Sequence, residues 1–475
     1  MKTYRSIQAL QQDLKEGAIS CETLVQSYLN RIEEKKDLNI FLEVFEKSAF
    51  EKAKEVDQKL AKNQAGKLAG VVLSIKDNIC YKDHKVGASS KILEDFESLF
   101  SATVVERLLA EDAIIIGRTN CDEFAMGSSN ENSHYGPVKH PDFPDHVPGG
   151  SSGGAAASVK ADLCIASLGS DTGGSIRQPA SFCGTVGFKP TYGRVSRHGL
   201  IAYASSFDQI GPFTHTIEDA ALLLEVMAGA DEYDSTLSER EVPQYLPKQK
   251  SPKEKKKIAY LDCYVEHEGL NPEVRQRTIE VIEALKAEGH EVEKVEFNLL
   301  EKLVPIYYIL TTAEASSNLA RYDGIHFGYR SENAHDLKST YVKSRSEGFG
   351  PEVKRRIMLG TYVLSAGYYD AYYSKAQKVR RIVKEQSRKI LSDYDFILSP
   401  TTPHPAFKIG EQSDDPIKMY LEDIFTVQAN LAGLPAISLP LGKDKTGKPF
   451  GIQLMGDSFE EGKLLRFSQY LMNRF

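Results

Sequence analysis

Short apolar runs alternate with helical stretches along most of the chain, and this alternation is typical of an α/β fold. Near-continuous apolar runs at 71–75, 113–116 and 163–168 are bounded by Gly or Asp or end at a charged residue, as expected of strands buried on both faces. Apolar residues at helical spacing predict helices over 103–111 and 218–229. The pattern therefore predicts a sheet whose strands are separated by helices.

The two ends of the chain extend this pattern. Residues 5–63 are predicted to be helical, with Ser20 as an N-cap and apolar residues recurring near helical spacing at Leu10, Leu14, Leu24, Tyr28 and Ile32. Residues 258–300 are predicted to form strand, helix and strand, and 301–392 to be mainly helical.

Three more short strands are expected near the carboxyl end, at 394–398, 436–440 and 451–454. If they complete the first sheet, residues 1–475 form one domain. Its parts are a helical layer (1–65), a core (68–235) and a second half (258–475).

Composition limits the classes of function. The 475 residues carry a formal net charge of −7, so the surface as a whole offers no broad basic footprint for nucleic acid or an anionic membrane. No window approaches 18 consecutive apolar residues and the amino terminus is polar, so we expect a cytoplasmic protein. The polar stretch 239–257, which ends in the basic run 253–257, is interpreted as a surface connection, with an RNA-binding patch as the alternative.

Histidines and cysteines show no metal-ligand spacing, so metal-dependent hydrolysis has no support in the sequence. The six cysteines are scattered without a C-x-x-C pair, and free thiols are expected in a chain of this size.

Two Gly/Ser-rich segments and one lysine carry the candidate chemistry. Ser151 lies in the segment 148–154 and Ser175 in 169–179, while Lys76 ends an apolar run. The serines lie 24 residues apart, which allows a short helix, a buried strand and a return turn that brings them face to face. No histidine lies within either segment, so the alternative of Ser-Lys catalysis is favoured over a histidine base.

Each of these features also has another interpretation. Lys76 could be an ordinary strand-end lysine paired with a carboxylate, since a catalytic amine needs a pKa about 3 units below its reference value to act as a base near pH 7. Glycine-rich turns could hold phosphate, but neither segment has the spacing of a phosphate-binding loop. The G-x-S-x-G elbow of the α/β-hydrolases is missing at Ser175. Residues 149–153 match its spacing around Ser151, but they follow a polar loop and not a predicted strand, which disfavours an esterase triad. The segment 171–175 suits an oxyanion hole, because glycines let successive N–H groups point into one space.

These residues together resemble the amidase signature family. Lys76, Ser151 and Ser175 match its Lys, cis-Ser and Ser positions, and the block 173–179 matches its signature. The match is dense from about 68 to 215 and looser elsewhere. Within the family the chain is most similar to the A subunits of the glutamyl-tRNA(Gln)/aspartyl-tRNA(Asn) amidotransferases, through the stretches 122–129, 189–197, 205–212, 314–324 and 352–357.

The resemblance implies a fold and a set of roles. The fold is α/β, with a large mixed β-sheet core covered by helices on both faces. Ser175 is the expected nucleophile, Ser151 a proton relay on a cis peptide and Lys76 the base. The N–H groups of Thr172, Gly173 and Gly174 are expected to hold the oxyanion. For the α-groups of glutamine the resemblance implies Tyr307, Arg356 and Asp423, with Tyr308 and Arg355 as adjacent alternatives.

The function implied is that of a glutaminase component, which hydrolyses glutamine to supply ammonia for converting Glu-tRNA(Gln) to Gln-tRNA(Gln); conversion of Asp-tRNA(Asn) to Asn-tRNA(Asn) is left open. The implied partners are a B subunit, which uses ATP and Mg²⁺ and binds most of the misacylated tRNA, and a small C subunit, forming a heterotrimer. No cofactor or metal is expected in this chain, and no membrane partner. Two alternatives are a stand-alone amidase of the same family acting on small or aryl amides, and a catalytically silent scaffold or phosphate-binding module.

Overall fold

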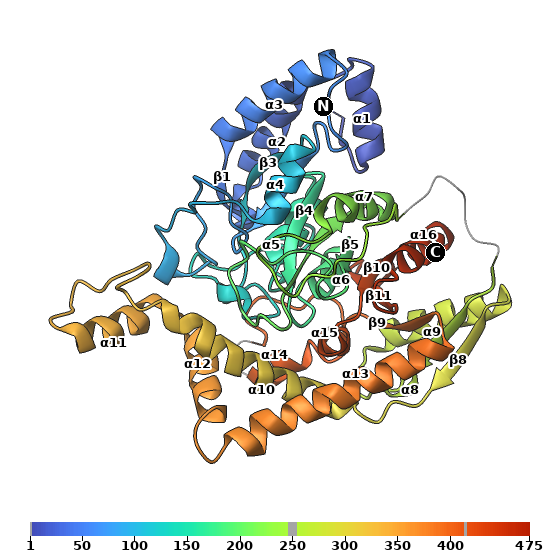
Figure 1. The fold of residues 1–475 in the computed structure, drawn as a ribbon. Coiled ribbons are helices and arrows are strands. Elements are labelled where there is room, and N and C mark those ends of the chain that lie inside the picture. The colour runs from blue at the N-terminus through green and yellow to red at the C-terminus, as the bar shows by residue number, and fades with distance from the viewer. Residues whose placement is uncertain (1, 246–253, 413–415) are drawn as a thin grey trace.

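The computed structural model describes residues 2–245, 254–412 and 416–475, and an eleven-stranded mixed sheet forms its centre. The strand order is β1-β3-β2-β4-β6-β5-β10-β11-β9-β7-β8, so strands from both halves of the chain share one sheet (Figure 1). The strands are β1 (Phe41–Val44), β2 (Val72–Lys76), β3 (Ile114–Thr119), β4 (Ala166–Asp171), β5 (Val186–Lys189), β6 (Gln209–Thr214), β7 (Lys257–Leu261), β8 (Glu291–Val295), β9 (Phe396–Pro400), β10 (Ala436–Lys443) and β11 (Pro449–Met455).

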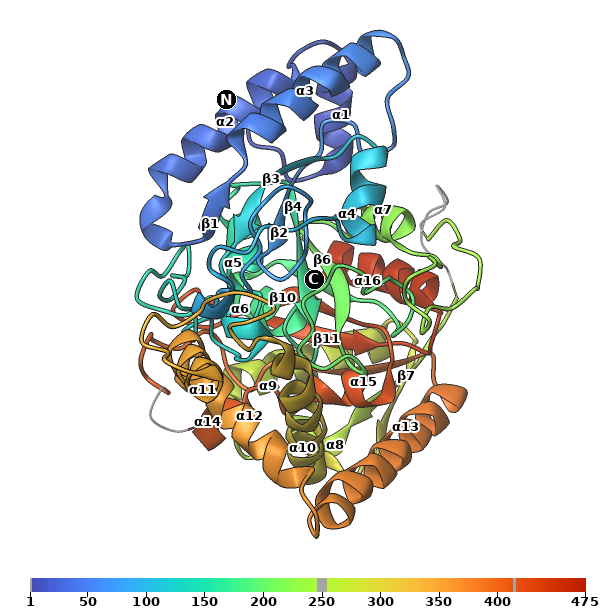
Figure 2. The ribbon, with the colours of Figure 1, turned by 60° about the vertical axis from the view of Figure 1, so that its left-hand side comes forward.

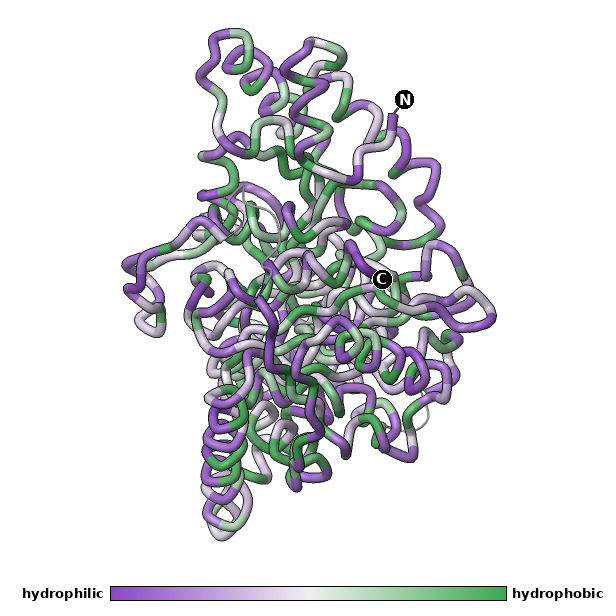
Figure 3. Tube along the Cα trace, turned by 90° about the vertical axis from the view of Figure 1, so that its right-hand side faces the viewer, coloured by the Kyte–Doolittle hydropathy of each residue, from purple (hydrophilic) through white to green (hydrophobic). Residues whose placement is uncertain are grey.

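Helices cover both faces of this sheet. In Figure 2, α5 and α6 lie on one side of the central strands and α7 and α16 on the other. Figure 3 shows the apolar segments gathered towards the interior and polar ones along the outer helices. The α-helices are α1 (Ile7–Lys15), α2 (Cys21–Glu34), α3 (Glu46–Ala61), α4 (Thr103–Ala110), α5 (Gly153–Lys160), α6 (Arg177–Cys183), α7 (Ile217–Met227), α8 (Asp262–Val265), α9 (Pro272–Ala287), α10 (Leu300–Asn318), α11 (Leu337–Gly348), α12 (Pro351–Val363), α13 (Lys375–Asp393), α14 (Pro416–Leu421), α15 (Val427–Ala432) and α16 (Glu461–Arg474).

Each apolar run predicted as a strand overlaps a strand of the sheet, although residues 163–165 precede β4 and residues 394–395 precede β9. Runs 71–75, 113–116 and 163–168 correspond to β2, β3 and β4, and the three runs near the carboxyl end correspond to β9, β10 and β11. The predicted sheet is therefore confirmed. Its fully buried strands read as continuous apolar runs because neither face meets water.

One part of the amino-terminal prediction was wrong. Residues 5–63 are mostly helical, and Ser20 caps α2 by accepting from the N–H of Thr23 at 3.1 Å. However, residues 41–44 form β1, an edge strand that pairs antiparallel with β3. Asn39, which precedes it, adopts a left-handed conformation with φ of 56°. Four residues are too few to show a strand period, and β1 exists because β3 offers an open edge.

The parallel pairing of β2 with β4 is what positions the candidate site. Residues 73–75 of β2 pair with 166–168 of β4 in the same direction. The carboxyl ends of two parallel neighbours lie at the same edge of a sheet. Lys76, which ends β2, is therefore brought beside Ser170 and Asp171, which end β4.

Of the basic run at 253–257, Lys253 lies outside the described residues, as do 246–252 of the polar connection. Lys257 begins β7. None of the helices in the described part of the chain combines the length and apolar character that crossing a bilayer requires.

Candidate functional site

Lys76 lies at the centre of a buried cluster of hydroxyl groups. Its side chain is fully buried, and Nζ donates to Oγ of Ser151 at 2.7 Å, of Ser152 at 2.9 Å and of Ser170 at 3.0 Å. Within the described ranges it forms no ion pair with a carboxylate, which removes the alternative of an ordinary paired lysine. Burial lowers the pKa of the Lys76 amine, while nearby acidic groups oppose this shift. The three hydroxyl groups that contact the amine are neutral and can accommodate its uncharged form.

The turn that carries Ser151 is fixed by two neighbouring side chains. The Gly150–Ser151 peptide bond is cis. The N–H of Gly150 donates to Oε1 of Gln178 at 2.9 Å, and a Cβ on Gly150 would lie 2.1 Å from the carboxylate of Asp122. Only glycine fits at this position, so backbone, Gln178 and Asp122 together set where the Ser151 hydroxyl lies.

The turn that carries Ser175 is built around a buried ion pair. Asp171 and Arg177 are both fully buried and lie 3.1 Å apart. Asp171 also accepts from the N–H of Gly174 at 2.8 Å and of Ile176 at 3.2 Å. Burial alone would raise the pKa of Asp171, but the charge of Arg177 outweighs this and lowers it to about 2. The carboxylate stays ionised and holds the turn in shape.

A second carboxylate supports the same turn. Oδ1 of Asp208 accepts from the Thr172 hydroxyl at 2.7 Å, and Oδ2 accepts from the N–H groups of Tyr203 and Ala204. Of the three predicted oxyanion donors, the N–H group of Gly174 already has a hydrogen-bond partner, Asp171. Among the described residues, the N–H groups of Thr172 and Gly173 have no comparable partner.

Gln178 joins the two serine turns to the second half of the chain. Its Nε2 donates to the carbonyl of Ser128 at 2.8 Å, and the hydroxyl of Ser128 lies 3.0 Å from both carboxylate oxygens of Asp423. Thr426 makes a further link, because its hydroxyl donates to the carbonyl of Gly173 at 2.6 Å. Asp423 is thereby connected to both serine turns.

Asp423 is buried beside a tyrosine and an arginine. Tyr308 donates to Oδ2 of Asp423 at 3.2 Å. Burial raises the pKa of the Asp423 carboxyl to about 7, against the lowering effects of Ser128 and Arg356. Among the described residues no cation forms an ion pair with it. A buried carboxylate with hydroxyl partners and no cation is suited to receive a cationic group from a ligand.

Arg356 is held in an aromatic enclosure. Its guanidinium lies between 5.0 and 5.5 Å from the ring centroids of Tyr203, Tyr308 and Tyr420. Nε donates to Glu352 at 2.8 Å and Nη1 donates to the Tyr203 hydroxyl at 2.8 Å. By contrast, the side chain of Arg355 is 49% exposed and pairs with Glu352.

Tyr307 touches the predicted oxyanion turn directly. A Cβ on Gly173 would lie 2.5 Å from Cζ and 2.6 Å from Oη of Tyr307. The ring is buried and packs edge-on against Phe207. The adjacent Tyr308 faces Asp423, so the two tyrosines line different parts of one region.

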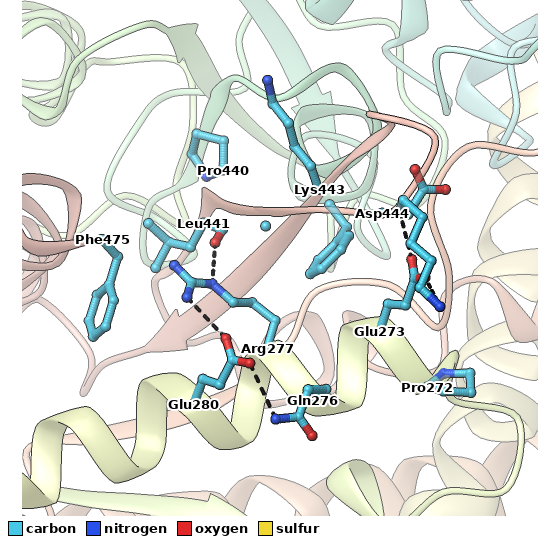
Figure 4. A pocket seen from close by; sticks show the side chains of 13 residues that line it. Pro272, Glu273, Gln276, Arg277, Glu280, Pro440, Leu441, Lys443, Asp444 and Phe475 are labelled. Atoms are coloured by element: carbon cyan, nitrogen blue, oxygen red, sulfur yellow. Dashed lines mark hydrogen bonds and ion pairs between the residues drawn. The ribbon is translucent and has the colours of Figure 1, made fainter.

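A cavity of about 180 Å³ opens beside these residues, and Ser129, Glu352, Arg356 and Tyr420 contribute to its lining. A larger groove of about 740 Å³ lies between α9 and the β10–β11 hairpin (Figure 4). There Arg277 donates to the carbonyl of Leu441 and pairs with Glu280. None of the predicted site residues lines that groove.

Sequence reasoning missed the residues that hold the site in place. Ser152 and Ser170 complete the hydroxyl shell of Lys76, and Ser170 had a usable signal, since it is a polar residue at the end of a buried strand. Other supporting residues come from distant parts of the chain, and no local pattern indicated these contacts: Asp122, Ser128, Tyr203, Asp208, Glu352 and Tyr420. In the described residues no group of His, Cys, Asp or Glu side chains is arranged to hold a metal ion.

Several known proteins match this chain over nearly its full length. The A subunit of the glutamyl-tRNA(Gln) amidotransferase of Chlorobium phaeobacteroides is 53% identical over 97% of this chain and 97% of its own length. The crystal structure of the A subunit of glutamyl-tRNA(Gln) amidotransferase from Thermotoga maritima is 42% identical, covers 94% of this chain and 90% of its own, and has a TM-score of 0.77. The peptide amidase of Stenotrophomonas maltophilia is 28% identical, covers 99% of this chain and 96% of its own, and has a TM-score of 0.82.

The family model for amidases matches residues 23–465, which include Lys76 and both serine turns as well as Arg356 and Asp423. The fold also agrees with the solved structures over nearly the whole chain. The chain therefore belongs to the amidase family.

Proposed function

We propose that this chain is the glutaminase subunit of a tRNA-dependent amidotransferase and that its reaction begins with attack of Ser175 on the side-chain amide of glutamine. The observation that carries the proposal is that the buried side chains of Arg356 and Asp423 both contact Tyr308, and that Asp423 is linked through Ser128 and Gln178 to the serine turns. Simple aryl amides have no α-carboxylate or α-ammonium and need no such pair.

The proton path follows from the position of the amine. Neutral Lys76 accepts the proton of Ser151 across 2.7 Å, and Ser151 takes the proton of Ser175 as the bond to the amide carbon forms. When the tetrahedral intermediate collapses, Ser151 passes a proton to the departing nitrogen and ammonia leaves. Water then attacks the acyl-enzyme, the same groups act in reverse, and glutamate is released.

Backbone donors stabilise the intermediate in this scheme. The N–H groups of Thr172 and Gly173 are available to the oxyanion, and that of Gly174 is shared with Asp171. Pre-oriented donors of this kind contribute about 3 to 4 kcal/mol each to lowering the barrier. Asp171 and Asp208 act as positioning residues, since they fix the turn without touching the substrate.

The α-groups of glutamine fit the second half of the site. The guanidinium of Arg356 suits an α-carboxylate, and Asp423 suits an α-ammonium. Tyr307 borders the space between Gly173 and this pair. Arg356 is preferred to Arg355, because its guanidinium lies inside the aromatic enclosure and Arg355 is half exposed.

The relatives' names support the wider assignment. Proteins named as the A subunits of glutamyl-tRNA(Gln) amidotransferases match at about half identity over nearly the full length of both chains. We infer a heterotrimer with B and C subunits, in which the B subunit uses ATP and Mg²⁺ to amidate Glu-tRNA(Gln) with the released ammonia. We also infer a cytoplasmic location. The chain is proposed to act as one domain, because strands from both of its halves share one sheet.

The experiment is glutamate release from glutamine by the chain, alone and with B and C subunits, ATP and Glu-tRNA(Gln). Ser175→Ala should abolish release, while Ser365→Ala, an exposed serine just after α12, should leave it unchanged. Turnover of a simple aryl amide without any turnover of glutamine would overturn the proposal in favour of a stand-alone amidase.

A further inference from the structure

Helix α13 carries a concentration of positive charge in a chain that is acidic as a whole. Residues 375–389 contain seven basic residues and one acidic residue, a net charge of +6, whereas the whole chain has a net charge of −7. The helix lies along the lower edge of the molecule in Figures 1 and 2. At 1.5 Å per residue the basic stretch extends about 21 Å.

The basic side chains face solvent. The buried face of α13 consists of Ala376, Val383, Ser387, Ile390 and Leu391. Arg380 is half buried and donates to Ser206 and to the carbonyl of Leu431. The other six are exposed: Lys375, Lys378, Arg381, Lys384, Arg388 and Lys389.

Few carboxylates neutralise this face. Within the described residues only Arg381 of these six forms an ion pair, with Glu385. Partial burial lowers the pKa of Lys384, and the charges of Arg388 and Arg380 lower it further. Like charges are therefore held together on one helix with Glu385 as their one ion-pair partner among the described residues, at an electrostatic cost that a polyanion would relieve.

A cluster of exposed tyrosines adjoins the amino end of the same helix. Tyr362 lies in the last turn of α12, and Tyr368 precedes the π-helical turn η5 (Tyr369–Ser374), which leads into α13. The ring of Tyr362 lies 4.4 Å from that of Tyr368 and 6.0 Å from that of Tyr372. These three side chains are between 40 and 43% exposed. The rings thus form an aromatic surface that is open to a flat ligand.

We propose that the exposed face of α13 and the tyrosine cluster of residues 362, 368 and 372 form an RNA-binding strip. The cations contact phosphates along the helix, and the tyrosines stack on unpaired bases at its amino end. If the function proposed above holds, the RNA is the tRNA that receives the ammonia. That identification rests on the proposed function, but the strip itself does not.

RNA fits both features better than the other polyanions. An acidic protein would satisfy the charge but has no particular use for three adjacent tyrosine faces. An anionic membrane surface favours an amphipathic helix with large apolar residues, whereas α13 exposes one large apolar residue, Ile382. A basic stretch beside exposed aromatic rings is the usual combination in proteins that bind single-stranded regions.

The first test measures binding of a labelled tRNA transcript to the full chain, with its copurifying subunits, over a series of salt concentrations. The variant replaces Lys378, Lys384 and Lys389 by Gln. The control replaces Lys47, Lys54 and Lys62 by Gln, which removes the same charge from α3 and the turn after it, at the opposite end of the molecule. None of these six lysines forms an ion pair within the described residues.

We expect the α13 variant to bind tRNA roughly 10- to 100-fold more weakly near 0.15 M salt, and the slope of log affinity against log salt to fall in magnitude by about 2 to 3. Equal affinity and slope for the α13 and α3 variants would overturn the proposal. Retained tRNA binding with loss of a copurifying subunit would also overturn it and assign the face to a protein partner.

The second test concerns stacking. Tyr368→Ala together with Tyr372→Ala should weaken binding of a single-stranded RNA 12-mer about tenfold, whereas Tyr341→Ala, an exposed tyrosine on α11, should not. Unchanged binding would refute the role of the cluster. Glutamate release without RNA should be the same in the parent and both variants, so failure of the strip and failure of the proposed function are distinguishable.

Discussion

The hydroxyl of Ser128 lies 3.0 Å from both carboxylate oxygens of Asp423, while the carbonyl of Ser128 accepts from Gln178 at 2.8 Å. Gln178 also holds the backbone next to Ser151. One residue of the first half therefore fixes the carboxylate of the second half relative to the serine turns. The distance between the proposed nucleophile and the proposed ammonium site thus depends on contacts between parts of the chain almost 300 residues apart.

The pH dependence of glutamine binding follows from the state of Asp423. Burial raises the pKa of this carboxyl to about 7, so it is ionised at pH 8 and neutral at pH 6. The KM for glutamine should therefore rise about tenfold per unit as the pH falls below 7. Steady-state glutaminase kinetics between pH 5.5 and 8.5 measure this, and a KM that stays flat over that range would contradict it.

The variant Asp423→Asn tests whether the pH dependence of the KM for glutamine comes from this carboxyl group. Its KM for glutamine should be high at every pH, and its turnover of glutaramate, which lacks the α-amino group, should match the parent.

The same carboxyl group affects stability. Because the pKa of Asp423 is raised in the folded state, its ionisation costs stability as the pH rises from about 4 to about 7. The variant should therefore gain in melting temperature over the parent at pH 8 and show no gain at pH 4. Asp393→Asn, an exposed position on α13, is the control.

The amine of Lys76 should limit activity on the acid side. Burial lowers its pKa, and only the neutral amine can accept the proton of Ser151. The rate of glutamate release at saturating glutamine should rise with pH through that lowered pKa, and Lys76→Met should reduce kcat by about a thousandfold or more. Lys160→Met, on the far end of α5, should retain activity. Full activity in Lys76→Met would exclude the lysine as the base.

Local patterns were sufficient to predict most of the sheet and to single out the candidate reactive groups. Fully buried strands such as β2 and β4 have no polar face, so their apolar runs were visible in the sequence. Lys76, Ser151 and Ser175 could be singled out as candidates because glycine-rich turns and a strand-end lysine are local features. The edge strand β1 was missed because its existence depends on β3, more than 60 residues away.

The supporting shell could not be predicted for the same reason. Asp208 bonds to Thr172, and Asp122 packs on Gly150, only after the sheet has brought their segments together. Nothing in the local sequence around Tyr203 or Glu352 indicates that both bond to Arg356. The different positions of Tyr307 and Tyr308, one against Gly173 and the other bonded to Asp423, are likewise visible only in three dimensions.

Removing the charge of Asp171 should unfold the turn that carries Ser175. Asp171 and Arg177 are both fully buried, and breaking such a pair by removing one partner costs about 3 to 5 kcal/mol. Asp171→Asn should lose about this much in chemical denaturation at pH 7. Lys286→Ala breaks an exposed pair with Glu283 and should cost less than about 1 kcal/mol. A loss as small for Asp171→Asn as for Lys286→Ala would contradict the structural role of the buried pair.

The pH dependence of that stability has a definite sign. The charge of Arg177 lowers the pKa of Asp171 to about 2, below its ordinary value. The stabilisation is therefore complete above about pH 4 and is lost as the pH falls towards 2. The difference in unfolding free energy between the parent and Asp171→Asn should shrink over that interval.

Gly173 tests whether the oxyanion turn and Tyr307 act as one unit. A Cβ at this position would lie 2.5 Å from the Tyr307 ring, so Gly173→Ala must displace either the ring or the turn. Displacement of an N–H donor that serves the transition state should lower kcat by about 100-fold or more and change KM little. Adding Tyr307→Leu to Gly173→Ala removes the obstructing ring and should restore part of kcat if the ring had forced the turn away.

Gly456→Ala is the matched control, because a Cβ there meets only ordinary contacts with Leu464 at 3.5 Å or more. Its kinetics should equal those of the parent. Equal kcat in Gly173→Ala and the parent would show that the N–H groups of this turn do not hold the oxyanion.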